Sequence, residues 1–411
     1  MLPGAVVHSC ELLLNRGAVI DAADSRGCTP LSHCAGLGND FVCKLLLDRG
    51  AQVDTKDSSG RTPLSHCAGL GSYFICMLLL DQGAQIDMRD SDGRTPLLHS
   101  VLQHGYDDIC KLLLNRGAAV DAADFRGRTP LSHCAGLGNA SVCKLLLDRG
   151  AQVNTRDLGG RTPLFYCAND FVCKLLLDWG AQVDTGDSSG RTPLSHAAKG
   201  GHTHICELLL NRGAIVDAAD SSRRTPLSHC AELGHVLLLD QIDTSGSSGS
   251  TLRLHNSTHV YDSSNYSTCE LLLNRGAMID SADSRGRTPL SHCAGTGNYS
   301  ACKLLLGRGA QVNTSDLGGR TPLSYSADLN RYSGHYLCSL LLDTGAKVDL
   351  ADYKGRTPLS YAVERGNLAI SRHLLHRGAN ASASDFNGHT PLWYAQMWNH
   401  IYSLLMSAEI R

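Results

Sequence analysis

The tripeptide Thr-Pro-Leu occurs eleven times, and this regularity constrains the fold more than any other feature of the chain. Most copies are 33 residues apart, and the other intervals are 30, 34, 36 and 63 residues. A period of this size predicts an array of stacked units instead of separate globular domains. The threonines that open the units are Thr29, Thr62, Thr95, Thr129, Thr162, Thr192, Thr225, Thr288, Thr321, Thr357 and Thr390.

One unit can be derived from its residues. Thr62 suits a helix N-cap and Pro63 suits the first helical position, so a short helix is expected to begin here. A second helix is expected over residues 73–80, where apolar side chains cover so much of the circumference that both sides should be buried. Gly83 supplies a left-handed stop. An Asp- and Gly-containing turn at residues 90–93 then leads to the next Thr-Pro-Leu.

This arrangement resembles the ankyrin repeat, with Thr-Pro-Leu in the first helix and Leu-Leu-Leu-x-x-Gly-Ala in the second. The resemblance implies an all-α repeat solenoid, a helix-turn-helix stack of about twelve units with β-turn or hairpin-like loops. The family's His after Thr-Pro-Leu is mostly Ser here, as at Ser32, Ser65 and Ser132. We therefore expect a hydroxyl to replace the histidine that links adjacent loops in the family. The exceptions are Leu98, Phe165 and Trp393.

Irregular spacing predicts four segments: a partial repeat at residues 1–28, a repeat stack at 29–239, a degenerate Ser/Thr-rich repeat or joint at 240–268, and a second stack at 269–411. The interval of 63 residues contains a damaged copy, Thr-Leu-Arg-Leu-His, at residues 251–255. Because each repeat is stabilised by its neighbours, we expect a flexible joint there. Residues 1–28 lack a first helix, which indicates either a truncated N-terminus or a resting place for a partner.

Charge and hydrophobicity limit the function classes. The 37 basic and 39 acidic residues give a net charge of −2, which argues against generic nucleic-acid binding. No run of 18 apolar residues and no signal-peptide pattern is present. We expect a monomeric intracellular protein without a transmembrane segment, cytoplasmic or nuclear, whose 17 cysteines are reduced.

Two groups of repeated side chains could be mistaken for chemistry. Four residues after each threonine stands a His or a Tyr, and cysteines recur five and about fourteen residues after it. Ser-His-Cys combines catalytic residue types, but its repetition would create many identical surfaces, so ring stacking and small buried thiols are the favoured interpretation. A metal or redox role is the alternative for the cysteines. Equivalent cysteines in adjacent units should be too far apart to bond, and Cys28, in a position usually held by Arg, is expected to be exposed.

The candidate partner-binding residues lie at the loops. An Arg precedes most Thr-Pro-Leu motifs. It either stabilises the fold, with its charge neutralised by an Asp four residues earlier, or binds an acidic partner. The candidates for binding are Arg61, Arg94, Arg128, Arg161 and Arg191. Apolar or aromatic loop tips replace the usual Ser in several units and are the sharper interface candidates. These tips are Phe125 and Arg126, Leu158, Leu317, Tyr353 and Lys354, and Phe386 and Asn387.

The sequence thus predicts a non-enzymatic scaffold that binds one or more proteins along its concave face and loop tips, without a cofactor. A substrate-recognition adaptor for an enzyme complex such as a ubiquitin ligase is the alternative, because ankyrin arrays often serve in this way. An enzyme or metal protein that uses the Ser-His-Cys columns is the least favoured reading.

Overall fold

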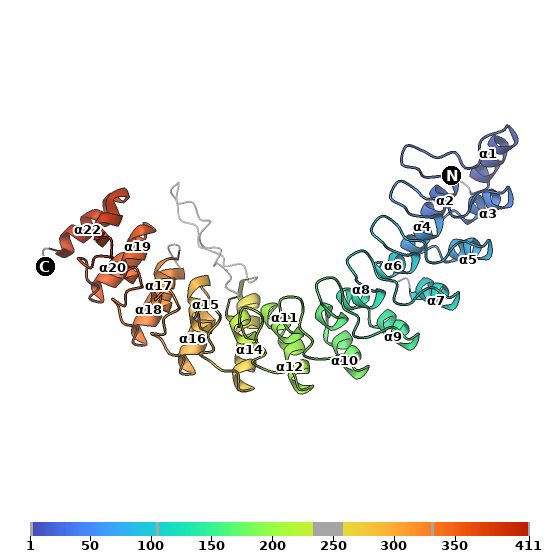
Figure 1. The fold of residues 1–411 in the computed structure, drawn as a ribbon. Helices are drawn as coiled ribbons and strands as arrows, with labels where there is room; N and C mark the ends of the chain where they lie inside the picture. Colours follow the sequence, from blue (N-terminus) through green and yellow to red (C-terminus); the bar gives the residue numbers. More distant parts are fainter. Residues whose placement is uncertain (1–2, 104–106, 233–257, 330–332, 410–411) are drawn as a thin grey trace. The chain divides into compact units, whose positions relative to one another are not determined.

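The computed structural model describes residues 3–103, 107–232, 258–329 and 333–409. These residues form helices, turns and loops, with no β-strand among them. They fall into two compact units, Met1–Ser188 and Ser189–Arg411. In each unit, pairs of short helices stack one behind another, and a loop leads from each pair to the next (Figure 1).

In the first unit, the Thr-Pro-Leu helices pack in one row and the Leu-rich second helices pack in another (Figure 1). The first row consists of α2 (Pro30–Leu37), α4 (Pro63–Leu70), α6 (Pro96–Val101), α8 (Pro130–Leu137) and a 3₁₀ turn, η1 (Pro163–Tyr166). The second row consists of α1 (Pro3–Asn15), α3 (Asp40–Asp48), α5 (Tyr73–Asp81), α7 (Asp107–Asn115), α9 (Ala140–Asp148) and α10 (Asp170–Asp178). Helix α1 lies in the row of second helices and packs on α3.

The second unit repeats this arrangement. Its first helices are α11 (Pro193–Lys199), α13 (Pro226–Ala231), α15 (Pro289–Thr296), α17 (Pro322–Ala327), α19 (Pro358–Glu364) and α21 (Pro391–Tyr394), followed by η3 (Ala395–Met397). Its second helices are α12 (Thr203–Asn211), α14 (Thr258–Asn274), α16 (Tyr299–Gly307), α18 (Ser333–Asp343), α20 (Leu368–His376) and α22 (Asn399–Glu409). Among the described helices, none is both long and apolar enough to cross a bilayer.

The Thr-Pro-Leu motif forms the helix start predicted for it. The Oγ1 atom of Thr62 accepts a hydrogen bond from the backbone N–H of Ser65 at 3.2 Å, and Pro63 occupies the first turn. The Ser65 hydroxyl lies 3.2 Å from the same Oγ1 atom. The serine therefore completes the helix cap inside its own repeat. The expectation that its hydroxyl links adjacent loops is wrong.

The second helices are sandwiched between neighbours, as the sequence predicts. In α5, Ile75, Cys76 and Leu79 are buried, whereas the Phe74 side chain is exposed. The helix contacts α3 and α7 on its two flanks and α4 in its own repeat, which leaves a fourth side to solvent. Gly83 ends the turn after α5 with a φ of 84°, in the left-handed region that favours glycine.

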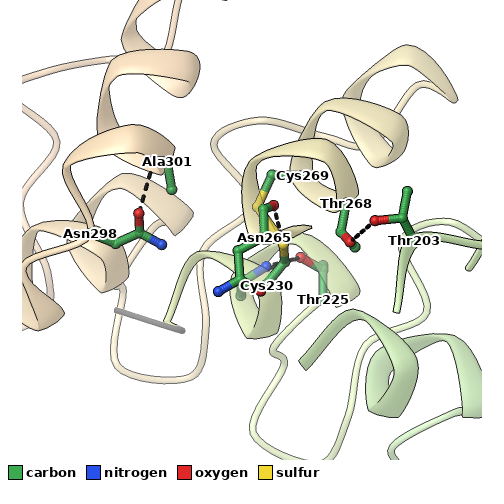
Figure 2. Close-up of a disulfide and its surroundings, with 9 residues drawn as sticks. Thr203, Thr225, Cys230, Asn265, Thr268, Cys269, Asn298 and Ala301 are labelled. Carbon is green, nitrogen blue, oxygen red and sulfur yellow. Dashed lines mark hydrogen bonds between the residues drawn. A yellow bond between two sulfur atoms is a disulfide. The ribbon is translucent and has the colours of Figure 1, made fainter. Parts of the chain in front are cut away.

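In the described part of the long interval after Thr225, α13 and α14 form one repeat whose two helices are far apart in sequence. Helix α13 packs against α14, and α14 also contacts α12 and α16, as a second helix does. A disulfide joins Cys230 on α13 to Cys269 on α14, with Cα atoms 6.0 Å apart (Figure 2). The backbone N–H of Ser284 donates to the carbonyl of Ser222 at 2.8 Å, which links this repeat to the next one.

These contacts bear on the four predicted segments. The damaged copy at residues 251–255 and the boundary at residue 240 lie outside the described residues. The boundary at residue 268 falls inside α14, which begins at Thr258. Because α13 and α14 pack directly, the repeat that begins at Thr225 is completed by residues 258–274, and the division of the chain at residues 240–268 stays a proposal.

Candidate functional site

The loop tips form a continuous chain of main-chain hydrogen bonds within each unit. In the first unit Phe125 donates its N–H to the carbonyl of Asp92 at 3.0 Å, and Leu158 donates to Arg126 at 3.0 Å. In the second unit the donors at successive junctions are Ser221, Ser284, Leu317, Tyr353 and Phe386, with acceptor carbonyls on Ser189, Ser222, Arg285, Gly318 and Lys354 at 2.8–2.9 Å. Each tip is thus fixed by the tip before it.

An aspartate shapes the loop tips, and at most of them it is buried. The Oδ1 atom of Asp316 accepts from the N–H groups of Gly318 and Arg320, both at 2.8 Å. Its Oδ2 atom accepts from the hydroxyl of Tyr325 at 2.5 Å. A side chain that bonds its own backbone two and four residues ahead closes a tight turn. The loop is therefore pinned both to itself and to the first helix that follows it.

The His/Tyr column supplies this second bond. His66 lies 3.0 Å from Asp57, and Tyr361 lies 2.6 Å from Asp352. His and Tyr interchange in the column because the Nε2–H of one and the hydroxyl of the other reach the same carboxylate. The expected stacking of rings along the array is not what holds these residues; their bond is to the loop aspartate. The column members with such a bond are His33, His66, His99, His133, His229, His292, Tyr166, Tyr325, Tyr361 and Tyr394.

Burial keeps the buried and half-buried histidines with such a bond neutral. It lowers the pKa of His292 to about 4, and the neighbouring Arg224 and Arg287 act in the same direction. Burial also lowers the pKa of His99 and His133. A neutral imidazole donates one hydrogen bond to the carboxylate. The histidines at these loops are therefore structural donors at neutral pH and not a positively charged surface.

The arginine column is half-buried and mostly faces its own loop. Arg61 contacts Asp57 at 3.3 Å and Arg128 contacts Asp124 at 3.5 Å, the pairing that would neutralise a ladder. In the second unit the Arg320 guanidinium lies over the rings of Tyr325 and Tyr361, 4.2 and 4.3 Å from their centroids. These contacts favour a structural role for the arginines over the binding of an acidic partner. The predicted candidates Arg61, Arg94, Arg128, Arg161 and Arg191 are all half-buried, and a role for them in binding stays a prediction.

The apolar loop tips are exposed and occur in consecutive repeats. In the first unit Phe125 is 63% exposed and Leu158 is 79% exposed. In the second unit the exposed fractions are 70% for Leu317, 69% for Tyr353 and 80% for Phe386. Arg126, Lys354 and Asn387 are exposed beside them. The main-chain bonds described above place the members of each run side by side.

The aromatic tips rest on the glycine of the preceding loop. A Cβ atom on Gly319 would lie 2.8 Å from Cδ1 of Tyr353, and one on Gly355 would lie 3.0 Å from Cδ1 of Phe386. Both glycines have a positive φ, 82° and 79°. One edge of each ring is therefore held against backbone while the remainder faces solvent.

A family model described as ankyrin repeats (3 copies) matches residues 42–124, 117–187, 170–244, 257–352 and 331–411. The chain belongs to the ankyrin-repeat family. No curated protein matches it. Ankyrin repeats are generally protein–protein interaction modules and are typically non-enzymatic. The family assignment agrees with the all-helical, repeated architecture of the described residues.

The Ser-His-Cys tripeptide does not act as a unit in these ankyrin repeats. Ser65 bonds to Thr62, His66 bonds to Asp57, and the Cys67 thiol lies 3.3 Å from the carbonyl of Leu64. The three side chains have separate partners in three directions. Nothing in this geometry aligns a nucleophile with a base.

The two cysteine columns meet inside those ankyrin repeats that carry a cysteine on both helices, a contact that the sequence does not predict. The Sγ atoms of Cys67 and Cys76 are 2.8 Å apart, and both residues are completely buried. The disulfide between Cys230 and Cys269 occupies the corresponding position, so the interpretation that all thiols are reduced is wrong for this pair. The predicted separation concerns equivalent cysteines in adjacent repeats. Cysteines such as Cys67 and Cys76, which meet, lie nine residues apart in sequence, on the two facing helices of one repeat.

Cys28 is buried, with 8% of its surface exposed, and its expected exposure is wrong. The thiol is shorter than the arginine that usually fills this position and lies 3.9 Å from Asp57 of the next loop. Two sets of potential metal ligands include it, Asp24 with His33 and Asp57 with His66. The Asp–His pair recurs in repeats that have an arginine at this position, and Arg61 already contacts Asp57, so the grouping does not indicate a metal site.

Proposed function

We propose that this protein is a non-enzymatic scaffold that binds a partner protein along the loop tips and the neighbouring first helices. The observation that carries the proposal is the run of Leu317, Tyr353 and Phe386, three exposed apolar side chains on consecutive tips. Isolated exposed apolar residues need no explanation. Three in register on a backbone fixed by hydrogen bonds form the kind of rigid apolar surface that interfaces use.

The second unit is the favoured contact surface because it has three exposed tips in consecutive repeats, and its two aromatic tips are already ordered. The rings of Tyr353 and Phe386 lie against Gly319 and Gly355, so little side-chain freedom is lost when a partner binds. Lys354 and Asn387 supply polar groups beside the rings. We infer a partner that presents apolar groups along an extended segment, with Phe125 and Leu158 as a second, shorter surface in the first unit.

Replacement of all three tips by serine tests the proposal. Serine is the residue that other tips carry, for example Ser58 and Ser91, so the variant L317S/Y353S/F386S should fold. The matched control is F41S/F74S/F171S, which removes three equally exposed phenylalanines from second helices. Proximity labelling in cells should lose the principal partner with the tip variant only. Equal labelling by both variants would reject the loop tips as the binding surface.

The adaptor alternative uses the same surface but requires a second, catalytic partner. Purification of the wild-type protein and of the tip variant with their bound partners distinguishes the two functions. A ubiquitin-ligase subunit that remains bound to the tip variant, while the first partner is lost, would favour the adaptor. Loss of every partner would favour the simple scaffold, which we propose acts as a cytoplasmic monomer.

A further inference from the structure

Cysteine pairs recur in the core of this protein, one thiol on each helix of a repeat. The Sγ atoms of Cys293 on α15 and Cys302 on α16 are 2.7 Å apart, as close as those of Cys67 and Cys76. All four side chains are completely buried. The Cys67 sulfur is closer to the facing Cys76 sulfur than to the carbonyl oxygen of Leu64, which is 3.3 Å away.

Three further repeats have the same pairing. The hydrogen bond with Cys43 raises the pKa of Cys34 because it stabilises the protonated thiol, and burial acts in the same direction. Burial and the facing Cys143 raise the pKa of Cys134. The Cys173 thiol, followed by burial, raises the pKa of Cys167. Together with the disulfide repeat, six repeats carry a cysteine on both helices.

The position itself is suited to a disulfide. Cys230 and Cys269 are bonded there with Cα atoms 6.0 Å apart, inside the usual 4.4–6.8 Å range for disulfides. They occupy the same two columns as Cys67 and Cys76. The bonded pair differs from the others in sequence separation, 39 residues, and not in its place within the repeat.

Other repeats in the chain have one thiol only, and they show what the position requires. The Ser100 hydroxyl lies 3.2 Å from the Cys110 sulfur, and the Ser326 hydroxyl lies 3.2 Å from the Cys338 sulfur. In a further repeat Ala197 replaces the first cysteine. The fold therefore needs a small side chain at this contact and does not need a second sulfur.

We propose that the five remaining cysteine pairs are disulfide-forming sites, at which oxidation by a peroxide joins the two helices of one repeat. The pairs are Cys34–Cys43, Cys67–Cys76, Cys134–Cys143, Cys167–Cys173 and Cys293–Cys302. One thiolate attacks hydrogen peroxide, which gives a sulfenic acid and, after protonation of the leaving hydroxide, water. The facing thiol then displaces a second water, so that two thiols and one peroxide yield one disulfide and two waters.

Accessibility sets the order of reaction. Cys167 is only partly buried, whereas its counterparts in the other four pairs are buried. Its repeat has only the four-residue η1 turn in place of a full first helix. Buried thiols must wait for local opening before they meet an oxidant. The Cys167–Cys173 bond should therefore form first and the others more slowly.

Peptide mapping of the intact folded protein tests the proposal. The protein is treated with hydrogen peroxide, alkylated, digested and analysed without reduction. We expect linked peptides that join the two cysteines of each named repeat, with Cys167–Cys173 earliest. The Cys230–Cys269 peptide serves as the positive control. Cys110, Cys206 and Cys338, which stand in single-thiol repeats, should appear in no linked peptide.

One variant and one stability measurement separate this reaction from random oxidation. Cys67→Ser reproduces the Ser100 and Ser326 arrangement, so it should fold, and it should remove the link to Cys76 without creating another. The oxidised wild type should also unfold at a higher temperature than the reduced protein, and dithiothreitol should reverse the difference. Absence of links within the five repeats while Cys230–Cys269 is detected, or links between different repeats, would overturn the proposal.

Discussion

His292 donates a hydrogen bond from Nε2 to the Oδ2 atom of Asp283, 3.1 Å away, and both side chains are buried. Tyr325 makes the equivalent bond to Asp316 in the next repeat. One contact between loop and first helix is thus made by two chemically different donors. Only the histidine changes its charge between pH 4 and 7.

Acid should weaken the histidine repeats before it protonates the carboxylates. The pKa of His292 is about 4 in the fold because burial disfavours its charged form, against an ordinary value of 6.5 in the unfolded chain. The unfolded state binds more protons between these values, so stability is present above pH 6.5 and is lost as the pH falls toward 4. The loss has an upper limit of roughly 3 kcal/mol for this residue. Urea unfolding at several pH values measures it.

His292→Tyr is the matched control, since Tyr occupies this column in the next repeat. It should keep the bond to Asp283 and flatten the pH dependence between 6.5 and 4. An unchanged pH profile would show that other groups cause the acid sensitivity.

Removal of the threonine cap should destabilise most repeats but not the one that begins at Thr162. Thr129→Ala deletes the acceptor for the Ser132 N–H and should cost about 1 kcal/mol. The Oγ1 atom of Thr162 is buried without a hydrogen-bond partner. Thr162→Val should therefore be neutral or stabilising. Denaturant unfolding of both variants gives the comparison, and equal losses would contradict the capping account.

Gly355 should tolerate a side chain less well than Gly378. Both glycines have a positive φ, 79° and 88°, so alanine costs about 1 kcal/mol of backbone strain at either position. A Cβ on Gly355 also meets the Phe386 ring at 3.0 Å, whereas nothing lies within 4 Å at Gly378. Thermal melting should show a larger loss for Gly355→Ala. If the partner binds Phe386, this variant should also weaken partner binding.

Loss of the Cys230–Cys269 disulfide should destabilise the repeat that begins at Thr225. The bond closes a loop with a sequence separation of 39. The chain-entropy model gives roughly 4 kcal/mol for a loop of this length. C230S/C269S should unfold at lower denaturant concentration than the wild type, and the difference should disappear in dithiothreitol. A difference that persists under reduction would assign the effect to packing.

The sequence predicted the repeat period and the helix starts because these depend on local chemistry. Thr62, Pro63 and Gly83 fulfil the roles expected of them. The exposed loop tips also lie where the sequence predicts them, at positions where most repeats have Ser and these repeats have an apolar residue. The sequence does not predict that residues 258–274 complete the Thr225 repeat. The damaged motif at residues 251–255 lies about one repeat length from the motifs on either side, so it resembles the start of a separate repeat. The packing of α14 on α12, α13 and α16, together with the Cys230–Cys269 bond, shows that α14 is the second helix.

The contacts of the cysteine columns could be predicted only in part. Their burial follows from their place on the apolar helix faces. Their meeting depends on how the two helices of a repeat face each other, which a sequence offset of nine residues does not specify. The burial of Cys28 likewise depends on Asp57 in the following loop, and no pattern within its own repeat indicates this neighbour.

The disulfide between α13 and α14 also fixes how the chain transmits tension. When the ends are pulled, force enters the repeat at Cys230 and leaves it at Cys269, so the segment between the two cysteines carries no load. With a separation of 39 residues, the extensible length is shorter by roughly 130 Å until the bond is reduced. In single-molecule stretching, dithiothreitol should add a step of this size.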